Sequence, residues 1–248
     1  MKFSLKLITI LLTLFVLNST AADISDKAKA TFDQYKNSVV NISLVLNMEV
    51  DIGGNIQPAQ ERKLDVKATV FSDQGVFVTA YSNIDPTIAQ ANRMIRGKKL
   101  NIKATYADIK LINKDGTETP LKVSLVDKDE NLAFLSFDKE HEDFSKVKLT
   151  NAGFNNGAQV SELDQIINIS CLAKNFFRAP SVKLGRITSV LSKPKTKYIS
   201  SVAEPGTPIY STNGGLVGIA VPQGFQKGKV MIVVIPANDI NELAKQVK

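Results

Sequence analysis

The chain has 248 residues with 31 basic and 24 acidic side chains, a formal net charge of +7, one Cys, one His and no Trp. A single Cys excludes an intramolecular disulfide, and one Cys with one His excludes the usual Cys and His zinc sites. With 44% hydrophobic and 22% charged residues, the composition is that of a globular protein, not of a disordered or collagen-like chain.

The first 22 residues have the order of a secretory signal peptide. Lys2 and Lys6 precede an apolar run, Leu7–Leu17, which is followed by small residues ending at Ala21 and Ala22. This run is too short to span a bilayer. We predict cleavage after Ala21 or Ala22, a secreted or periplasmic mature protein and no stable membrane span after cleavage. An uncleaved N-terminal anchor is the alternative.

The basic side chains are scattered along the mature chain. Their densest cluster is Lys193, Lys195 and Lys197, without interleaved aromatic residues or a nucleic-acid motif. Such a pattern is typical of a solvated basic face, so we expect no nucleic-acid partner.

In chain order, a short helix comes first and strands follow. Ile24, Ala28, Phe32 and Tyr35 recur at helical spacing, which predicts an N-terminal helix within residues 23–37. Apolar and β-branched runs then predict a first group of strands within residues 38–138. The predicted strands are Ser38–Leu46, Val66–Phe71, Val76–Ala80, Ile109–Asn113, Thr119–Val126 and Leu132–Phe137.

A polar, charged run over residues 139–146 is the predicted linker. Strands resume within residues 147–248, and a final helix is expected with Asn238 or Asp239 as its N-cap. The predicted strands are Gln159–Leu163, Ile166–Leu172, Val182–Leu191, Lys197–Val202, Ile209–Tyr210, Leu216–Val221 and Lys229–Ile235. Two groups of strands without strand–helix alternation indicate an all-β protein of two barrels or sandwiches.

The order of several segments resembles that of trypsin-like serine proteases of the Deg/HtrA type. Ser72–Ile84 (SDQGVFVTAYSNI) resembles the strand–turn–strand that delivers the catalytic histidine, and Lys122–Phe137 resembles the stretch with the catalytic aspartate. Other matching segments are Ser38–Ile42, Lys183–Val190, Pro205–Gly206, Gly215–Ala220 and Val233–Asn238. The resemblance implies two six-stranded β-barrels with short N- and C-terminal helices, an active site between the barrels and no PDZ domain.

The resemblance also shows that the catalytic positions are substituted or lost. The histidine position falls on Ser82, and the aspartate position falls on Asn131. The segment that should carry the nucleophile reads Pro205-Gly206-Thr207-Pro208, without the serine and its glycine neighbours. A triad needs a nucleophile, a base that titrates near neutral pH and an orienting carboxylate. No confident catalytic residue remains, which predicts a pseudoprotease.

Other chemistry rests on weak candidates. Cys171 and His141 form a conceivable thiol–imidazole dyad, but Cys171 lies in an apolar strand and His141 in a charge run. Ser211, near two glycines, and Thr207 are further candidate nucleophiles. A cation site of Asp127, Asp129 and Glu130 is less expected than a solvated loop, so we predict no metal and no cofactor.

Three hypotheses on function follow. The first is an exported protease-fold protein that has lost catalysis and binds a protein or an extended peptide between its barrels, by strand addition. The second is an active serine-type endopeptidase with a non-standard catalytic set. The third is a structural subunit of an envelope assembly. Members of the family often trimerise through N-terminal aromatic residues, so Phe32 and Tyr35 make a homo-oligomer conceivable.

Overall fold

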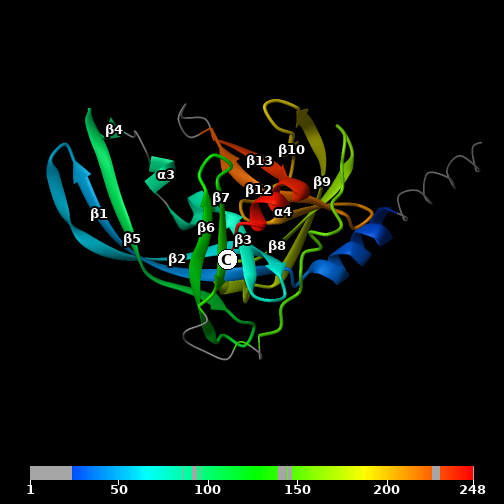
Figure 1. The fold of residues 1–248 in the computed structure, drawn as a ribbon, viewed down its shortest axis with the longest axis horizontal. Helices are drawn as coiled ribbons and strands as arrows, with labels where there is room; N and C mark the ends of the chain where they lie inside the picture. Colours follow the sequence, from blue (N-terminus) through cyan, green and yellow to red (C-terminus); the bar gives the residue numbers. More distant parts are fainter. Residues whose placement is uncertain are drawn as a thin grey trace, which may run out of the picture.

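The computed structural model describes residues 24–85, 87–90, 94–95, 97–138, 144, 147–224 and 230–247. Most of these residues form two closed antiparallel β-barrels of six strands each, as predicted (Figure 1). The predicted signal peptide, most of the predicted linker 139–146 and His141 lie outside the described residues. Among the described residues, no helix has the length and apolarity that a bilayer crossing requires.

The first barrel is built from strands that precede residue 138. They are β1 (Val39–Ile52), β2 (Asn55–Ser72), β3 (Val76–Ala80), β5 (Lys98–Ile112), β6 (Glu118–Asp127) and β7 (Leu132–Phe137). Their order is β1-β2-β3-β7-β6-β5, and the pairing of β5 with β1 closes the barrel. Two single helical turns, α2 (Tyr81–Ile84) and α3 (Thr87–Gln90), lead from β3 to the two-residue strand β4 (Met94–Ile95), which pairs with β5.

The second barrel repeats this topology. Its strands are β8 (Gln165–Cys171), β9 (Pro180–Leu191), β10 (Lys197–Ser200), β11 (Pro208–Ser211), β12 (Leu216–Gln223) and β13 (Met231–Pro236). Their order is β8-β9-β10-β13-β12-β11, closed by the pairing of β11 with β8. If the six strands of each barrel are numbered along the chain, both barrels have the cyclic order 1-2-3-6-5-4.

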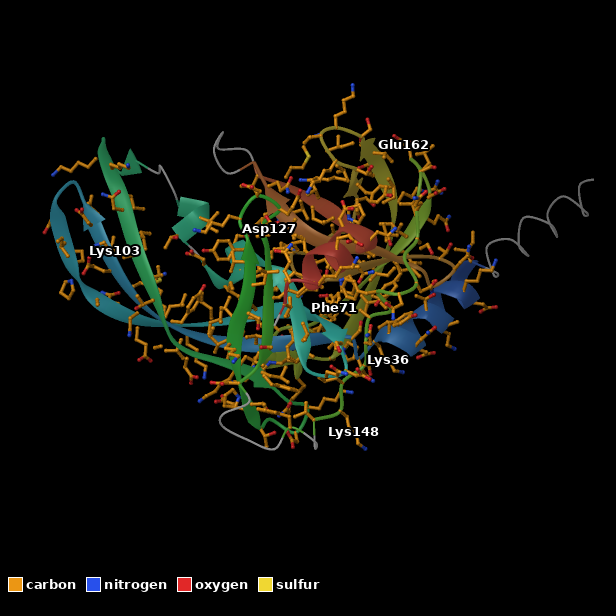
Figure 2. All side chains as sticks on the ribbon, in the orientation of Figure 1. Lys36, Phe71, Lys103, Asp127, Lys148 and Glu162 are labelled. Atoms are coloured by element: carbon orange, nitrogen blue, oxygen red, sulfur yellow. The ribbon has the colours of Figure 1, made fainter. Side chains whose placement is uncertain are left out.

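Strands β1, β2 and β5 are much longer than predicted and extend beyond the first barrel as a three-stranded sheet (Figure 1). The Gly53–Gly54 turn joins β1 to β2 at its end, and Figure 2 places Lys103 of β5 far out on it. Residues Asn55 to Lys63 of β2 are all exposed, so no buried apolar stripe marks this half of the strand in the sequence.

A single hydrophobic cluster joins the two barrels and both terminal helices. It combines Phe134 of β7 with Ile167 of β8, and it includes Tyr35 of the N-terminal helix (residues 24–35) and Ile240 of α4 (Ala237–Ala244). Tyr35 stacks on Tyr210 with ring centroids 4.6 Å apart. The barrels therefore pack through a continuous apolar core.

The start of the final helix differs from the prediction. The N-cap of α4 is Pro236, so the prediction of Asn238 or Asp239 is wrong. The pyrrolidine ring holds φ of Pro236 at −57°, close to the helical value, and the helix begins directly after β13. No side-chain cap is needed for the chain to turn at this point.

Candidate functional site

Ser82 and Asn131, the residues at the histidine and aspartate positions of the resemblance, lie in direct contact. Ser82 belongs to α2, directly after β3, and Asn131 precedes β7, which pairs with β3. The Ser82 backbone N–H donates to Asn131 Oδ1 at 2.8 Å, and Asn131 Nδ2 donates to Ser82 Oγ at 3.0 Å. Asn131 Nδ2 also donates to the Pro222 carbonyl of β12 at 2.6 Å. The pair therefore links the first barrel to the second.

Neither side chain of this pair can transfer a proton near neutral pH, because a hydroxyl and a carboxamide do not titrate there. Tyr81, on the same helical turn, donates its hydroxyl to Asp85 Oδ2 at 2.8 Å. Burial and this hydrogen bond raise the pKa of Tyr81 well above its usual value, so the phenol stays protonated. Ser82 and Asn131 are thus held together by hydrogen bonds, but neither side chain can act as a general base.

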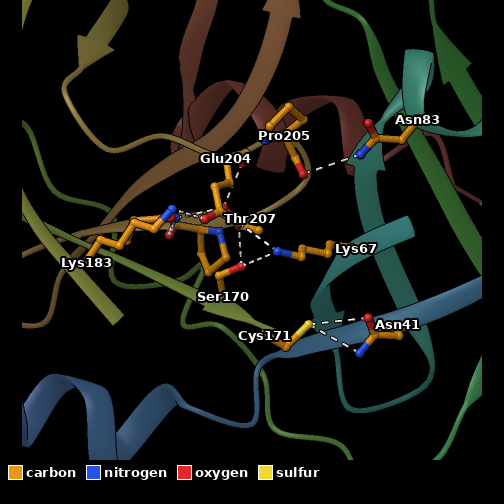
Figure 3. Close-up of polar contacts among 11 residues, drawn as sticks. Asn41, Lys67, Asn83, Ser170, Cys171, Lys183, Glu204, Pro205 and Thr207 are labelled. Carbon is orange, nitrogen blue, oxygen red and sulfur yellow. Dashed lines mark hydrogen bonds and ion pairs between the residues drawn. The ribbon is translucent and has the colours of Figure 1, made fainter. Parts of the chain in front are cut away.

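The Gly206–Thr207 loop packs tightly against the first barrel (Figure 3). Thr69 Oγ1 donates to the Gly206 carbonyl at 3.0 Å. Thr207 is fully buried, and its hydroxyl donates to the Glu204 carbonyl at 2.7 Å and accepts from Asn168 Nδ2 at 2.7 Å. Because both hydrogen-bonding roles of this hydroxyl are filled and solvent cannot reach it, Thr207 is not placed to attack a substrate.

A charged cluster beside this loop was not anticipated from the sequence (Figure 3). Glu204 accepts from Lys67 Nζ at 2.7 Å, from Ser170 Oγ at 2.8 Å and from Lys183. Burial alone would raise the pKa of Glu204, but the hydrogen bonds from Lys183, Lys67 and Ser170 outweigh it and lower the pKa to about 2. Lys67 lies more than 100 residues from Ser170 and from Glu204 along the chain. No local sequence motif could therefore predict these contacts.

Lys67 also donates to Ser170 Oγ at 2.8 Å, a distance at which a neutral lysine could act as a general base. Here Lys67 donates to the Glu204 carboxylate as well, at 2.7 Å, and forms an ion pair with it. Ser170 itself is buried, and its hydroxyl donates a hydrogen bond to the Glu204 carboxylate. The contact is therefore an ion-pair network between barrels rather than a serine–lysine nucleophile.

Two of the weaker candidate nucleophiles, Cys171 and Ser211, lie apart on neighbouring strands: Cys171 ends β8, and Ser211 pairs with Ile166 near the start of that strand. Cys171 is buried and hydrogen-bonded to Asn41, and burial raises the pKa of its thiol. Ser211 Oγ accepts the Gly215 N–H at 3.2 Å in the turn before β12. His141, the proposed partner of Cys171, lies outside the described residues.

The three acidic residues considered as a cation site do not converge. Asp127 Oδ1 accepts the backbone N–H of Glu130 at 2.9 Å, while the Glu130 carboxylate pairs with Lys195 at 3.2 Å and Lys197 at 2.6 Å. Within the part of the chain that the structure describes, no group of three His, Cys, Asp or Glu side chains is arranged to hold a metal ion.

A cavity of about 720 Å³ lies where the two barrels meet. The first barrel contributes Asn41, Asp65 and Lys67, and the second contributes residues 172–175. Its volume falls within the range of small-ligand and peptide side-chain pockets. The charged cluster of Lys67 and Glu204 borders this cavity.

The cavity adjoins an open sheet edge. Strand β2 pairs with β3 only from Thr69 onward, and from Asn55 to Ala68 its only strand partner among the described residues is β1. Asp65, which lines the cavity, lies on this open part of β2. Lys67 lies at its end, where the Lys67 carbonyl already accepts from Thr79 Oγ1 at 2.7 Å. An unpaired edge of this kind can accept an additional strand from another chain.

The two barrels and their junction define a trypsin-like double-barrel fold of the HtrA type. The chain is similar to the MamO protease domain from Magnetospirillum magneticum, with a TM-score of 0.52 and 15% identity over 85% of this chain and 97% of that one. It is also similar to Deg5, with a TM-score of 0.55 and 13% identity over 88% and 92% of the two chains. No protein-family model and no curated protein sequence matches the chain.

Proposed function

We propose that this protein is an exported protein of the trypsin-like fold that does not cleave peptide bonds and instead binds an extended segment of another protein. The Ser82–Asn131–Pro222 hydrogen-bonded set carries this proposal, because Ser82 and Asn131, to which the resemblance assigns the triad's base and orienting acid, have side chains that cannot titrate near pH 7. The buried, saturated hydroxyl of Thr207 supports the same conclusion for the nucleophile.

The binding role rests on the junction between the barrels. The cavity of about 720 Å³ offers a place for a side chain, and the open edge of β2 offers backbone groups beside it. Together these features favour a peptide in extended conformation over a compact small molecule. Export is supported by the apolar run Leu7–Leu17 after Lys2 and Lys6.

Loss of catalysis is tested by incubating the purified protein, without residues 1–22, with a fluorescent unfolded protein and with a fluorophosphonate probe. We expect neither cleavage nor labelling. Cleavage that the probe blocks would contradict the proposal, and the labelled residue would identify the nucleophile. Ala substitutions at Ser211, Thr207 and Cys171 then show whether one of the weak candidates is responsible.

Peptide binding is tested with a cavity-filling variant, Ala173→Trp, against a library of labelled extended peptides. Ala173 lines the cavity and is exposed, so the indole occupies the cavity without disturbing a core. Thr105→Trp, on the exposed face of β5, adds the same bulk elsewhere. We expect peptides retained by the parent protein to be lost only with Ala173→Trp. Equal retention by both variants would place binding outside this junction.

A further inference from the structure

The hairpin turn between β8 and β9 exposes an unusual concentration of apolar side chains. Eleven large hydrophobic side chains are exposed in the described residues, and five of them lie in this one hairpin. They are Leu172, Phe176, Phe177, Val182 and Leu184. Scattered single apolar residues on a surface are ordinary, whereas a group of this kind marks a contact surface.

Two adjacent phenylalanines form the tip of this hairpin. Phe176 is 58% exposed and Phe177 is 95% exposed. Phe177 and Arg178 have φ values of +55° and +51°, in the left-handed region that non-glycine residues rarely enter. The short 3-10 helix η2 (Lys174–Phe176) leads directly into this pair. The fold thus holds Phe177 away from every core at a cost in backbone strain, which points to a function for the exposed ring.

The same hairpin is basic. Residues 172–186 (LAKNFFRAPSVKLGR) contain four cations, namely Lys174, Arg178, Lys183 and Arg186, and no carboxylate. Asp65 pairs with Arg178, and Glu204 pairs with Lys183. Lys174, which adjoins the aromatic tip, has no carboxylate partner among the described residues, so a positive charge remains there. Arg186 has none either, but it pairs with Gln165 at the other end of the ladder.

We infer that the β8–β9 hairpin docks the protein onto an anionic lipid surface. Exposed aromatic rings partition into the boundary between lipid headgroups and acyl chains, and neighbouring Lys and Arg side chains bind the anionic headgroups. A groove for a soluble peptide would enclose the rings, whereas Phe177 is almost fully solvated. This surface docking differs from a membrane span. The two rings of its tip, Phe176 and Phe177, do not line the cavity between the barrels, whereas Leu172 and Lys174 belong to both surfaces.

The absence of Trp from the chain gives a direct test. Phe177→Trp introduces a single indole whose emission shifts to shorter wavelength when it enters a bilayer. The protein is used without residues 1–22, because the apolar run there would itself enter lipid; the described cores and both barrels lie in the remainder. We expect a shift with vesicles of equimolar phosphatidylglycerol and phosphatidylcholine, and none with phosphatidylcholine alone. Ile56→Trp, at an exposed site on the distant β1–β2 hairpin, should show no shift.

Co-sedimentation with the same vesicles measures how much the two phenylalanine rings and the Lys174 charge each contribute to vesicle binding. The double variant Phe176→Ser/Phe177→Gly should bind at least about tenfold more weakly, since it removes both rings. Glycine at position 177 accepts the observed φ without strain, so folding is retained. Lys174→Glu should weaken binding, while the matched charge reversal Lys122→Glu, at an exposed position of β6, should change it much less.

Three outcomes would overturn the inference. The first is that the parent protein does not bind anionic vesicles. The second is that the variant without both rings binds them as well as the parent does. The third is that sedimentation velocity shows self-association of the parent protein that Phe176→Ser/Phe177→Gly abolishes, because a second copy of the chain then covers the hairpin. The double variant Phe176→Ser/Phe177→Gly keeps the cavity lining of residues 172–175 intact, so its loss of vesicle binding is distinguishable from the loss of peptide binding with Ala173→Trp.

Discussion

Asn131 combines a buried side chain, hydrogen bonds to two other residues and a left-handed backbone with φ of +56°. Asparagine tolerates this conformation better than most residues do. Asn131→Ala leaves the Ser82 N–H and the Pro222 carbonyl without partners and keeps the strained backbone. We expect a loss of about 2–4 kcal/mol in the free energy of unfolding, measured by chemical denaturation.

Asn131→Asp places a carboxylate in an environment that suits a carboxamide. One carboxylate oxygen still accepts the Ser82 N–H, while the other faces the Pro222 carbonyl, so ionisation is opposed and the pKa is raised. An acid whose pKa is raised by folding destabilises the fold above that pKa. The loss of unfolding free energy should therefore be larger at pH 7 than near pH 4. A pH-independent loss would show that the carboxylate turns toward solvent.

Glu204 has the opposite pH dependence. Its pKa in the folded protein is about 2, below the value of 4.5 for the unperturbed group, because Lys183, Lys67 and Ser170 outweigh the effect of burial. A carboxylate with a lowered pKa stabilises the fold above the unfolded pKa, and this contribution is lost as the pH falls from about 5 to about 2. Glu204→Gln should cost about 1–2 kcal/mol at pH 7, after allowance for solvent screening, and little near pH 2.

Glu242→Gln is the matched control for that measurement, because Glu242 forms an exposed ion pair with Lys245 at 2.7 Å. It should change the unfolding free energy by less than about 0.5 kcal/mol at either pH. If the two variants behave alike across the pH range, the cluster around Glu204 does not contribute to the stability of the junction.

The sequence was informative about single residues only where they adjoin apolar strands. Ser82 lies shortly after the predicted strand Val76–Ala80, and Asn131 lies directly before Leu132–Phe137. The structure brings these two side chains together as hydrogen-bonded partners. Lys67 and Glu204 lie 137 residues apart. Their contact depends on how two barrels pack, which no local pattern encodes.

At the scale of elements, the strands of both barrels were predicted, but the exposed half of β2 was missed, and the predicted strand Gln159–Leu163 is not formed. The prediction of Val66–Phe71 covers only the end of β2 (Asn55–Ser72), because residues 55–63 are exposed and lack alternating apolar positions. Backbone hydrogen bonds between β1 and its neighbours β2 and β5 stabilise the extension. These bonds do not require particular side chains. Hydrophobic periodicity therefore underestimates strand length wherever a sheet leaves its core.

The Gly206 loop depends on close approach to β2. Gly206 has φ of +80°, and a Cβ atom there would lie 2.4 Å from the Lys67 carbonyl oxygen. Gly206→Ala should therefore cost about 3 kcal/mol or more in unfolding free energy, from steric overlap added to strain. Gly214 has φ of +83° but ordinary contacts, so Gly214→Ala measures the strain alone, about 1 kcal/mol. Equal losses would mean that the loop can move away from the first barrel.

At the scale of the whole molecule, the hydrophobic cores do not divide by barrel. One cluster contains Val78 and Phe134 from the first barrel together with Ile169 and Ile219 from the second. Each barrel also has an internal cluster of its own. The continuous packing across the barrels thus indicates one folding unit.

This packing predicts one cooperative unfolding transition for the two barrels. In differential scanning calorimetry the calorimetric and van't Hoff enthalpies should agree. Tyr35→Ala removes a ring that stacks on Tyr210 and should cost about 3 kcal/mol. Because the cluster reaches both barrels, the variant should lower the midpoint of the single transition without dividing it. Two transitions, only one of which moves with Tyr35→Ala, would instead show that the second barrel unfolds independently of the first.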